Sequence, residues 1–404
     1  MRYKKSKFNY FFGFKGDYYV YNTNTSALAQ LETEDFEIED PYVGPLFDNG
    51  YIVEQDKDEV KDLIQNINTY ANLPKKELDI TIILTEMCNF RCVYCYQTKN
   101  VHTFSKEDAD NLINQANALY EKGIEVLNIH YFGGEPLLNV DMLRYLDIEL
   151  KKVAESKNKG YRSYITTNGS MLTKDLIKEI GFDTFYLTFD GNRDWQNKLK
   201  VSPIDSYENN LKIIEAILSL SQSNINIRLN VCKENQDSFV ETIQDIVSVK
   251  GYDKERIKFE ISPLKKFTAN ARFEELSPRE YAKAHWKLEQ ALKETGIKLF
   301  LPKPFLQPCK YITGNAFCIG PSMKSCYCSS DDTVIHEKVD LAKCICDKRY
   351  EHQLPEECLE CNVMPLCIHS CGLLKKDGAA CIPEKFILKE ILCDFLEYPE
   401  TWKE

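Results

Sequence analysis

The cysteines of this 404-residue chain restrict its possible folds more than any other feature. There are 16, of which three lie between residues 88 and 95 and twelve between residues 309 and 393. The N-terminal apolar stretch is short, is broken by Asn9, Gly13 and Lys15, and precedes no small-residue cleavage site, which argues against a signal peptide. Clustered cysteines in the cytosol favour metal ligation or redox chemistry over disulfides. We therefore expect a cytoplasmic metal-binding protein.

Short apolar segments alternate with amphipathic ones through the middle of the chain. Strands are expected at 79–85, 124–132, 163–167, 184–189, 225–231 and 256–262. Helices are expected between them at 105–122, 142–156, 174–180, 207–220 and 238–249. Six strand–helix repeats predict an α/β fold, in which a parallel sheet curls into a partial (β/α)6 TIM-like barrel. Such sheets place their chemistry at the C-terminal ends of the strands.

The sequence changes character on either side of this repeat. Residues 1–76 predict a small α+β module with a hairpin centred on residues 15–17 and a helix near 60–70. Residues 77–298 are expected to form the barrel, with a last helix at 277–294. Residues 299–404 hold twelve cysteines and little apolar periodicity, so we expect metal ligation to stabilise them.

Charge and hydropathy exclude two classes of partner. The net charge is −11, and no Lys/Arg stripe is interleaved with aromatic residues. Because nucleic-acid binding depends on cationic neutralisation of phosphates, a nucleic-acid partner is not expected. No apolar run approaches the ~20 residues of a membrane-spanning helix, so no membrane association is expected either.

The loop after the first expected strand carries three cysteines. Cys88, Cys92 and Cys95 have the spacing C-x3-C-x2-C. Cubane iron–sulfur clusters are usually held by four cysteine thiolates, so a loop that offers three leaves one iron open to another ligand. Zinc sites more often use C-x2-C pairs with a distant second pair. The motif favours an open [4Fe–4S] cluster, with zinc or a chance spacing as the alternatives.

With Tyr94 before its last cysteine, this motif resembles the signature of radical S-adenosylmethionine (SAM) enzymes. The resemblance implies that SAM binds the open iron and that its reductive cleavage gives a 5′-deoxyadenosyl radical, which abstracts hydrogen from a substrate. It also implies a set of cofactor-binding residues: Tyr94, Gly133, Gly134, Glu135, Pro136, Thr167, Asn168 and Asn230. Glycines suit this role because their backbone can approach a ligand closely. Asp190-Gly191 matches a further family element, but the His and Arg usual downstream are replaced here by Trp195-Gln196 and lysines.

The tail contains a second cysteine pattern. Its core has the spacing C-x2-C-x5-C-x3-C over Cys358, Cys361, Cys367 and Cys371. With cysteines on either side, it resembles the SPASM domain, which carries two auxiliary four-iron clusters in maturases of sulfatases and ribosomal peptides. The resemblance implies that the first auxiliary cluster uses Cys309, Cys328 and Cys371, with Cys318 as the candidate fourth ligand. For the second cluster it implies Cys358, Cys361, Cys367 and Cys381. Zinc at the C-x2-C pair is the alternative.

The resemblance leaves the substrate open between two kinds of maturase. Sulfatase-maturing members typically place an aspartate directly after the cysteine of the first auxiliary element, whereas Ser329 follows Cys328 here. In organisation, the N-terminal segment resembles the winged-helix-like module with which peptide maturases bind a leader peptide as an added strand, and a plain structural extension is the alternative.

The leading hypothesis is a maturase of ribosomally made peptides (RiPPs). It would install a cross-link, with a Cys thioether as the first expectation, on a precursor peptide with a leader sequence. Carbon–carbon cross-linking and epimerisation are other outcomes. Three [4Fe–4S] clusters and SAM would serve as cofactors, and a flavodoxin or ferredoxin would donate electrons. Formylglycine formation on a sulfatase and a non-catalytic zinc-binding scaffold are the alternative functions.

Overall fold

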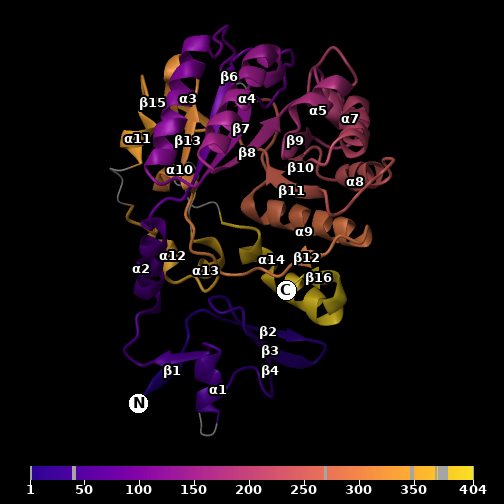
Figure 1. Cartoon of the computed structure of the whole chain (residues 1–404). Helices are drawn as coiled ribbons and strands as arrows, with labels where there is room; N and C mark the ends of the chain where they lie inside the picture. The colour runs from indigo at the N-terminus through magenta and orange to yellow at the C-terminus, as the bar shows by residue number, and fades with distance from the viewer. Residues whose placement is uncertain are drawn as a thin grey trace.

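A nine-stranded sheet forms the centre of the computed structural model, which describes residues 2–38, 42–267, 271–345, 350–368, 371 and 381–403 (Figure 1). The strand order is β11-β10-β9-β8-β7-β6-β13-β14-β15. The six strands from β6 to β11 are parallel and follow one another in sequence order. They are β6 (Glu77–Thr85), β7 (Val126–Gly133), β8 (Gly160–Thr166), β9 (Thr184–Phe189), β10 (Asn224–Val231) and β11 (Ile257–Pro263). This part of the chain is a partial barrel.

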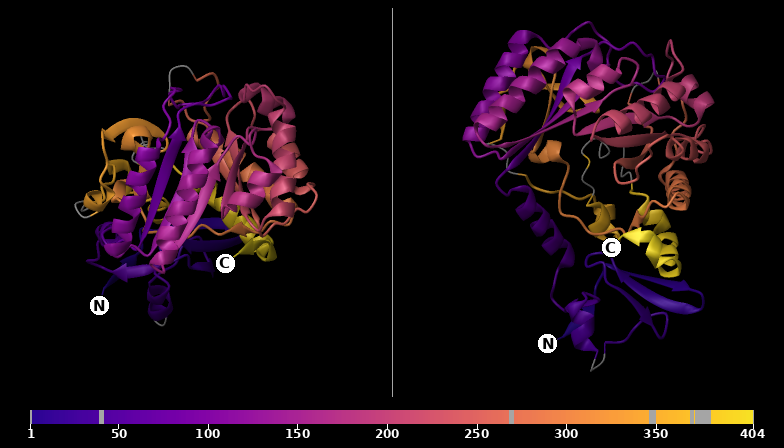
Figure 2. Two further views of the ribbon diagram at one scale, coloured as in Figure 1. Left: turned by 45° about the horizontal axis from the view of Figure 1, so that its top comes forward. Right: turned by 45° about the vertical axis from the view of Figure 1, so that its right-hand side comes forward.

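Helices connect the parallel strands and cover the outer face of the sheet (Figure 2). They are α3 (Lys106–Glu121), the 3-10 turn η1 (Pro136–Asn139), α4 (Val140–Ser156), α5 (Lys174–Ile180), α6 (Arg193–Leu199), α7 (Ser206–Leu220), α8 (Phe239–Val247) and α9 (Pro278–Glu294). The main apolar core lies between sheet and helices, where Ile80 of β6 and Leu112 of α3 are completely buried. Burying side chains of this size stabilises a fold by about 1.5–3 kcal/mol each. The helices thus position the strand ends that carry the candidate site.

The N-terminal module is small and, in its described residues, combines strands with two helices. It contains β1 (Tyr3–Lys5), β2 (Asn9–Phe14), β3 (Asp17–Asn22), β4 (Leu28–Leu31), α1 (Val43–Asp48), β5 (Ile52–Glu54) and α2 (Glu59–Ala71). Lys15 and Gly16 form the two-residue turn between β2 and β3, and both have positive φ, 51° and 93°. Such a turn matches the twist of the two strands and fixes their register. The predicted hairpin is therefore present.

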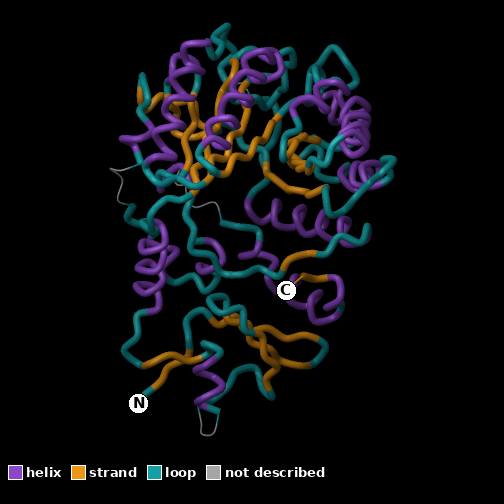
Figure 3. The backbone as a smooth tube through the Cα atoms, in the orientation of Figure 1, coloured by secondary structure: helices purple, strands orange, loops and turns teal. Residues whose placement is uncertain are grey.

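The cysteine-rich segment combines short elements with long loops (Figure 3). Its elements are β12 (Leu299–Phe300), α10 (Lys310–Thr313), β13 (Ala316–Ile319), η2 (Pro321–Met323), β14 (Ser325–Cys328), β15 (Asp331–His336), α11 (Leu341–Cys344), α12 (Glu356–Leu359), α13 (Met364–Cys367), α14 (Glu384–Glu397), η3 (Pro399–Thr401) and β16 (Trp402–Lys403). Strand β13 pairs in parallel with β6, with Phe317 opposite Ile80, and β14 and β15 continue the sheet in antiparallel fashion. The segment therefore extends the barrel sheet.

The predicted fold class, an α/β partial barrel followed by a cysteine-rich segment, is confirmed. All six expected barrel strands are present, and the 184–189 strand has the predicted bounds. Helices α6 and α14 and strands β13–β15 were not predicted. The division at residues 76 and 298 stays a prediction, and β13–β15 join the barrel sheet across the second boundary. In the described part of the chain, no helix is long and apolar enough to cross a membrane.

Candidate functional site at the mouth of the barrel

The three-cysteine loop follows β6 and is held in place by backbone hydrogen bonds. Arg91 N donates to Val201 O at 2.8 Å, and Val93 N donates to Leu199 O at 2.9 Å, so the loop lies against the end of α6 and the residues directly after it. Phe90, between the first two cysteines, is completely buried and anchors the loop from within. These contacts bring the loop over the C-terminal ends of the parallel strands.

Cys88, Cys92 and Cys95 line one cavity of about 410 Å³ at these strand ends. Six of the eight predicted cofactor-binding residues line it as well: Tyr94, Gly133, Gly134, Thr167, Asn168 and Asn230. The cavity has wall residues from the loop, from β7 to β11 and from the cysteine-rich segment. The structure thus brings together most of the positions that the sequence singled out.

Two glycines let the end of β7 approach the cysteine loop. A Cβ on Gly134 would lie 2.1 Å from Met87 O, and one on Gly133, where φ is +134°, would lie 2.4 Å from Thr85 O. Gly134 N donates to Thr85 O at 2.8 Å, which holds the two strand ends together. Because only glycine fits here, its bare backbone forms this part of the cavity wall.

Glu135 and Pro136 are buried but do not line the cavity. The Glu135 carboxylate accepts hydrogen bonds from Thr167 Oγ1 at 2.7 Å, Asn168 N at 2.8 Å and Leu137 N at 3.2 Å. Complete burial raises the pKa of Glu135 to about 6. The carboxylate therefore joins the loops after β7 and β8. Contact between Glu135 and SAM stays a prediction of the family resemblance.

Tyr94 is fixed by a buried polar network. Its hydroxyl donates to Asp190 Oδ2 at 2.6 Å, and Asn230 Nδ2 donates to Asp190 Oδ1 at 2.9 Å. Asn235 Nδ2 donates to the backbone oxygen of Asp190 at 2.9 Å. Burial raises the pKa of Asp190 above its ordinary value. The Asp190-Gly191 element thus positions the aromatic residue beside the cysteines even though its downstream neighbours depart from the family.

Sequence reasoning missed Lys200, which lies on the cavity wall with only 2% of its surface exposed. Its ammonium group donates to Thr188 O at 2.8 Å and also to Thr188 Oγ1. A buried lysine is costly unless its charge is compensated, and here the buried carboxyl groups of Asp190 and Glu135 lie within electrostatic range of the ammonium group, as does the Cys92 thiol. The local sequence does not predict that Lys200 is buried, because a lysine at the end of a short amphipathic helix is usually solvated.

The donor set at the cavity fits a cluster. Burial raises the pKa of Cys88 and raises that of Cys92 to about 12, so these thiols are protonated at neutral pH until a metal displaces the protons. Among the described residues, no three His, Cys, Asp or Glu side chains stand close enough to hold a single metal ion. A four-iron cubane is wider than one ion, and its ligands can stand farther apart. Three thiols around one cavity are the donors that such a cluster requires.

The second predicted set of tail cysteines is also gathered in one place. Cys358, Cys361, Cys367 and Cys381 line a single small cavity, together with Lys385. Lys385 Nζ donates to Cys381 Sγ at 3.3 Å. Four thiols with a neighbouring cation fit the requirements of an anionic thiolate-ligated cluster.

The first predicted set is not gathered in this way. Cys371 lines the cavity at the strand ends, Cys328 lines a neighbouring cavity of about 420 Å³, and Cys309 is the residue directly before α10. Cys318 is buried and lies opposite Cys326 on β14, with which its thiol is hydrogen-bonded. Sequence reasoning gave Cys326 no role, although it lines the same cavity as Cys328.

The remaining cysteines lie elsewhere. Cys232 is completely buried, Cys393 packs against the cluster formed by Phe12, Tyr21 and neighbouring residues, and Cys344 packs against the main core. Cys346, which the sequence left without a role, lies outside the described residues.

The cysteine-rich segment closes over the main cavity. Tyr96, directly after the third cysteine of the loop, donates its hydroxyl hydrogen to Ser329 O at 2.7 Å. Ser330 and Cys371 contribute to the cavity wall. The two cysteine patterns, which are more than 200 residues apart in the sequence, therefore meet at one site.

The sequence model of the Radical SAM superfamily matches residues 82–246, from within β6 to within α8. Residues 82–246 therefore match a radical SAM domain, and the resemblance found in the cysteine loop is confirmed. SAM and one [4Fe–4S] cluster are the cofactors that this superfamily implies.

Solved structures of two kinds share the fold of the chain. Streptococcus suis SuiB bound to precursor peptide SuiA is 13% identical, with a TM-score of 0.56 over 94% of this chain and 98% of that one. The protein anSMEcpe with bound AdoMet and Cp18Cys peptide is 16% identical, with a TM-score of 0.55 over 81% of this chain and 98% of that one.

Curated sequence relatives match a smaller part. GTP 3′,8-cyclase of Helicobacter pylori is 29% identical over 173 residues, which is 41% of this chain and 50% of that protein. The chain thus spans about half the length of these curated relatives. The alignment is too short to include both the barrel and the tail.

Proposed function

We propose that this chain is a radical SAM maturase that acts on a ribosomally made precursor peptide and installs a cross-link, with a Cys thioether as the product to test first. One observation carries the proposal. The three thiols of the loop share a cavity with residues of the cysteine-rich segment, so a substrate there would lie between the radical site and the tail.

Residues at the cavity mouth have separable roles in this proposal. Cys88, Cys92 and Cys95 hold the radical cluster. The bare backbone at Gly133 and Gly134 and the polar groups of Thr167, Asn168 and Asn230 contact SAM, and Lys200 offers a cation to its carboxylate. When bound, the cluster and SAM supply a 5′-deoxyadenosyl radical for hydrogen abstraction. Tyr94, held by Asp190, keeps the adenine side of the cavity in shape.

The tail would hold the two auxiliary clusters. Cys358, Cys361, Cys367 and Cys381 form the second site, which the shared cavity supports. Cys309, Cys328, Cys371 and Cys318 form the first site in the proposal, and the binding of a cluster there would have to draw these thiols together. Ligands that assemble only with their metal are common in metal-stabilised segments.

The share of this chain that aligns with each solved structure supports a leader-binding role for the N-terminal module. The alignment with SuiB covers 94% of the chain. The part that it leaves out is shorter than the 76-residue module, so at least part of the module is aligned. The alignment with anSMEcpe covers 81%. A fold counterpart of most of the module is thus found in a structure determined with a precursor peptide. Edge strands of its three-stranded sheet, β2 and β4, could accept an added peptide strand.

Formylglycine formation on a sulfatase is the second candidate function. The comparable TM-score of anSMEcpe favours it, while Ser329 in place of an aspartate after Cys328 does not. The zinc scaffold has less support, because the matched radical SAM domain implies a cluster and SAM.

The test is an anaerobic reaction of the reduced enzyme with SAM and each short cysteine-containing peptide that the reading frames next to its gene encode. We expect deoxyadenosine and a peptide lighter by two hydrogens per link. An unmodified precursor, together with oxidation of the cysteine in a sulfatase-motif peptide, would instead identify the second candidate function. Metal analysis separates the scaffold, because three cubanes need about twelve irons per chain.

A further inference from the structure

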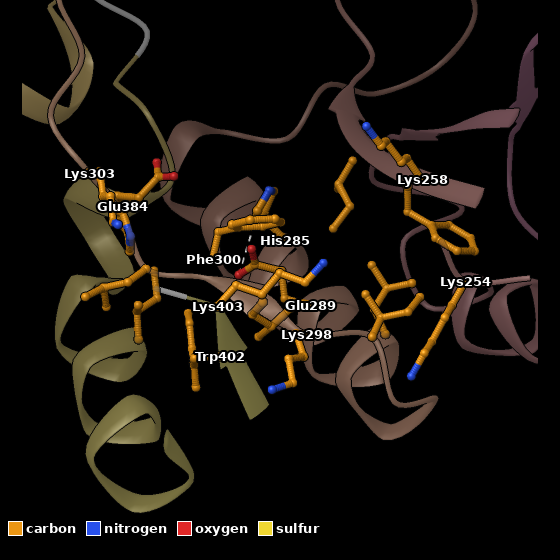
Figure 4. Close-up of a pocket in the computed structure, with 18 of the residues that line it drawn as sticks. Lys254, Lys258, His285, Glu289, Lys298, Phe300, Lys303, Glu384, Trp402 and Lys403 are labelled. Atoms are coloured by element: carbon orange, nitrogen blue, oxygen red, sulfur yellow. Dashed lines mark ion pairs between the residues drawn. The ribbon is translucent and has the colours of Figure 1, made fainter. Parts of the chain in front are cut away.

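Another cavity, larger than those described above, lies on the flank of the barrel. Its volume is about 1090 Å³, and its walls come from strand β11, helices α9 and α14, and the β12–β16 pair (Figure 4). Within the described part of the chain, none of the proposed cluster or SAM ligands lines it. We call it the flank cavity.

Five lysines surround the flank cavity: Lys254, Lys258, Lys298, Lys303 and Lys403. All five are exposed, and none forms an ion pair with another described residue. Figure 4 shows Lys254 and Lys258 on one side, Lys303 on the other and Lys298 below. Three glutamates, Glu255, Glu289 and Glu384, also line the cavity. The five lysines outnumber them, so the hollow is positive on balance in a chain of net charge −11, and such a hollow favours an anionic ligand.

The floor of the flank cavity is apolar. Ile257, Phe259 and Ile261 of β11 contribute to it, as do Leu299 and Trp402 of the β12–β16 pair. Glu289 Oε2 lies 3.5 Å from His285 Nδ1 in the wall, a distance at which the two pair when His285 is protonated. A ligand that fits must therefore present both apolar and acidic groups.

Strand β11 is the edge of the sheet and pairs, among the described strands, with β10 alone. The backbone of an edge strand can receive an extended peptide as a further strand. Tyr281 already donates its hydroxyl hydrogen to Ile261 O at 2.9 Å, which leaves the beginning of β11, beside Lys258, as the accessible part. In an extended peptide, successive side chains point to opposite sides, so alternate residues would face the floor and the lysines.

We propose that the flank cavity binds an extended segment of the precursor peptide in which acidic and apolar residues alternate. This inference rests on the proposed function for the identity of the peptide. The segment lies along β11, its apolar side chains contact the floor, and its carboxylates pair with the surrounding lysines. Binding on the flank holds the substrate to the enzyme without occupying the mouth of the barrel.

The test measures fluorescence anisotropy of two labelled probes on the anaerobically reconstituted full-length enzyme. One probe is a nonapeptide of alternating Glu and Val, and the other has the same composition with all Glu before all Val. We expect the alternating probe to bind about tenfold more tightly and to be weakened by added salt. Equal affinity for the two probes, or no binding of the alternating probe, overturns the proposal.

Two triple lysine variants test whether the alternating probe binds at the flank cavity. The triple variant Lys258→Glu/Lys298→Glu/Lys403→Glu should weaken binding of the alternating probe by about tenfold or more. The triple variant Lys174→Glu/Lys178→Glu/Lys283→Glu has the same charge change on exposed lysines outside the flank cavity and should stay within about twofold. Equal weakening by both would show a net-charge effect and overturn the proposal.

Two further readouts separate the competing explanations. Deoxyadenosine formation without peptide should be unchanged in both triple variants, which shows that they are folded and loaded. If an acidic flavodoxin binds through the same lysines and the alternating probe does not, the flank cavity is an electron-donor surface and the peptide proposal is overturned. Failure of the precursor to be modified would contradict the proposed function, whereas probe binding alone decides the flank cavity.

Discussion

At the scale of single residues, the buried thiols of the loop give the first prediction. Replacing Cys92 with Ala removes one of three ligands from the cavity, so deoxyadenosine formation should fall below detection. The tail cysteines are untouched, and about two thirds of the iron should remain. Iron analysis and chromatography of the SAM cleavage products measure both effects. Cys393→Ala, in an apolar cluster away from the cavity, should keep full activity; cleavage by the Cys92 variant would refute the assignment.

The glycine at the end of β7 gives the second prediction. In Gly134→Ala the new Cβ would meet Met87 O, so β7 and the cysteine loop must move apart. We expect a loss of about 1–3 kcal/mol in stability, as for other overpacked sites, and weaker SAM binding. Gly44→Ala is the matched control, because nothing lies within 4 Å of a Cβ there. Urea unfolding and SAM titration would check the pair, and equal behaviour of the two variants would argue against close approach at Gly134.

Glu135 gives a prediction for pH. Burial raises its pKa from 4.5 to about 6, so the folded chain binds this proton more tightly than the unfolded chain. Stability from this group is therefore greatest below pH 4.5 and falls by about 2 kcal/mol as pH rises to 6. Glu135→Gln should remove that slope, whereas Glu155→Gln, on the exposed face of α4, should keep it. Urea midpoints between pH 4 and 7 would show the difference, and a wild-type slope of the opposite sign would exclude this explanation.

At the scale of elements, two helices share a cap but differ in what the cap contacts. Helices α3 and α9 both begin with a capping box, Ser105 with Asp108 and Ser277 with Glu280. Only the Asp108 carboxylate also accepts a bond from η2, from Ser322 N at 3.2 Å. The cap of α3 therefore ties the barrel to the cysteine-rich segment as well as starting a helix.

This difference predicts unequal effects of the same substitution. Glu280→Ala should cost about 1 kcal/mol, as other cap losses do, and Asp108→Ala should cost about 1 kcal/mol more because Ser322 N loses its partner. Limited proteolysis should also cut the β14–β15 hairpin faster in the Asp108 variant. Equal costs and equal cleavage rates would show that the contact with η2 contributes nothing.

At the scale of the whole molecule, the N-terminal module packs on the cysteine-rich segment. Phe12 and Tyr21 share an apolar cluster with Val363 and Leu366, which lie between the cysteines of the second tail site. Tyr21 also donates its hydroxyl hydrogen to Pro302 O at 2.5 Å. The module thus supports the backbone that carries this site.

We therefore expect Tyr21→Ala to affect the second tail site, because Cys361 of that site packs against the same apolar cluster. Loss of a buried aromatic side chain costs about 3–5 kcal/mol, and here the cost falls on the module and the cysteine-rich segment. Iron content should fall by up to about four atoms per chain while SAM cleavage persists. Phe47→Ala, at a half-exposed ring in the same module, should retain its iron. Full iron in the Tyr21 variant would show that the two parts are independent.

Local patterns in the sequence determined the barrel strands, the cap at Ser105 and the thiols of the loop. A strand repeats every 2 residues and a helix every 3.6, so both can be read from short stretches. The close spacing of Cys88, Cys92 and Cys95 likewise places them in one loop. The hairpin at Lys15-Gly16 was predictable for the same reason, because its turn chemistry is local.

Only the tertiary structure decided which segments that are distant in the sequence contact one another. It placed Lys200 on the cavity wall, turned Glu135 inward towards the loop after β8, and paired β13 with β6 across more than 200 residues. It also assembled the flank cavity from three separate parts of the chain. Contacts of this kind depend on which surfaces meet after the chain has collapsed. The local periodicity of the sequence, which predicts strands and helices, does not predict them.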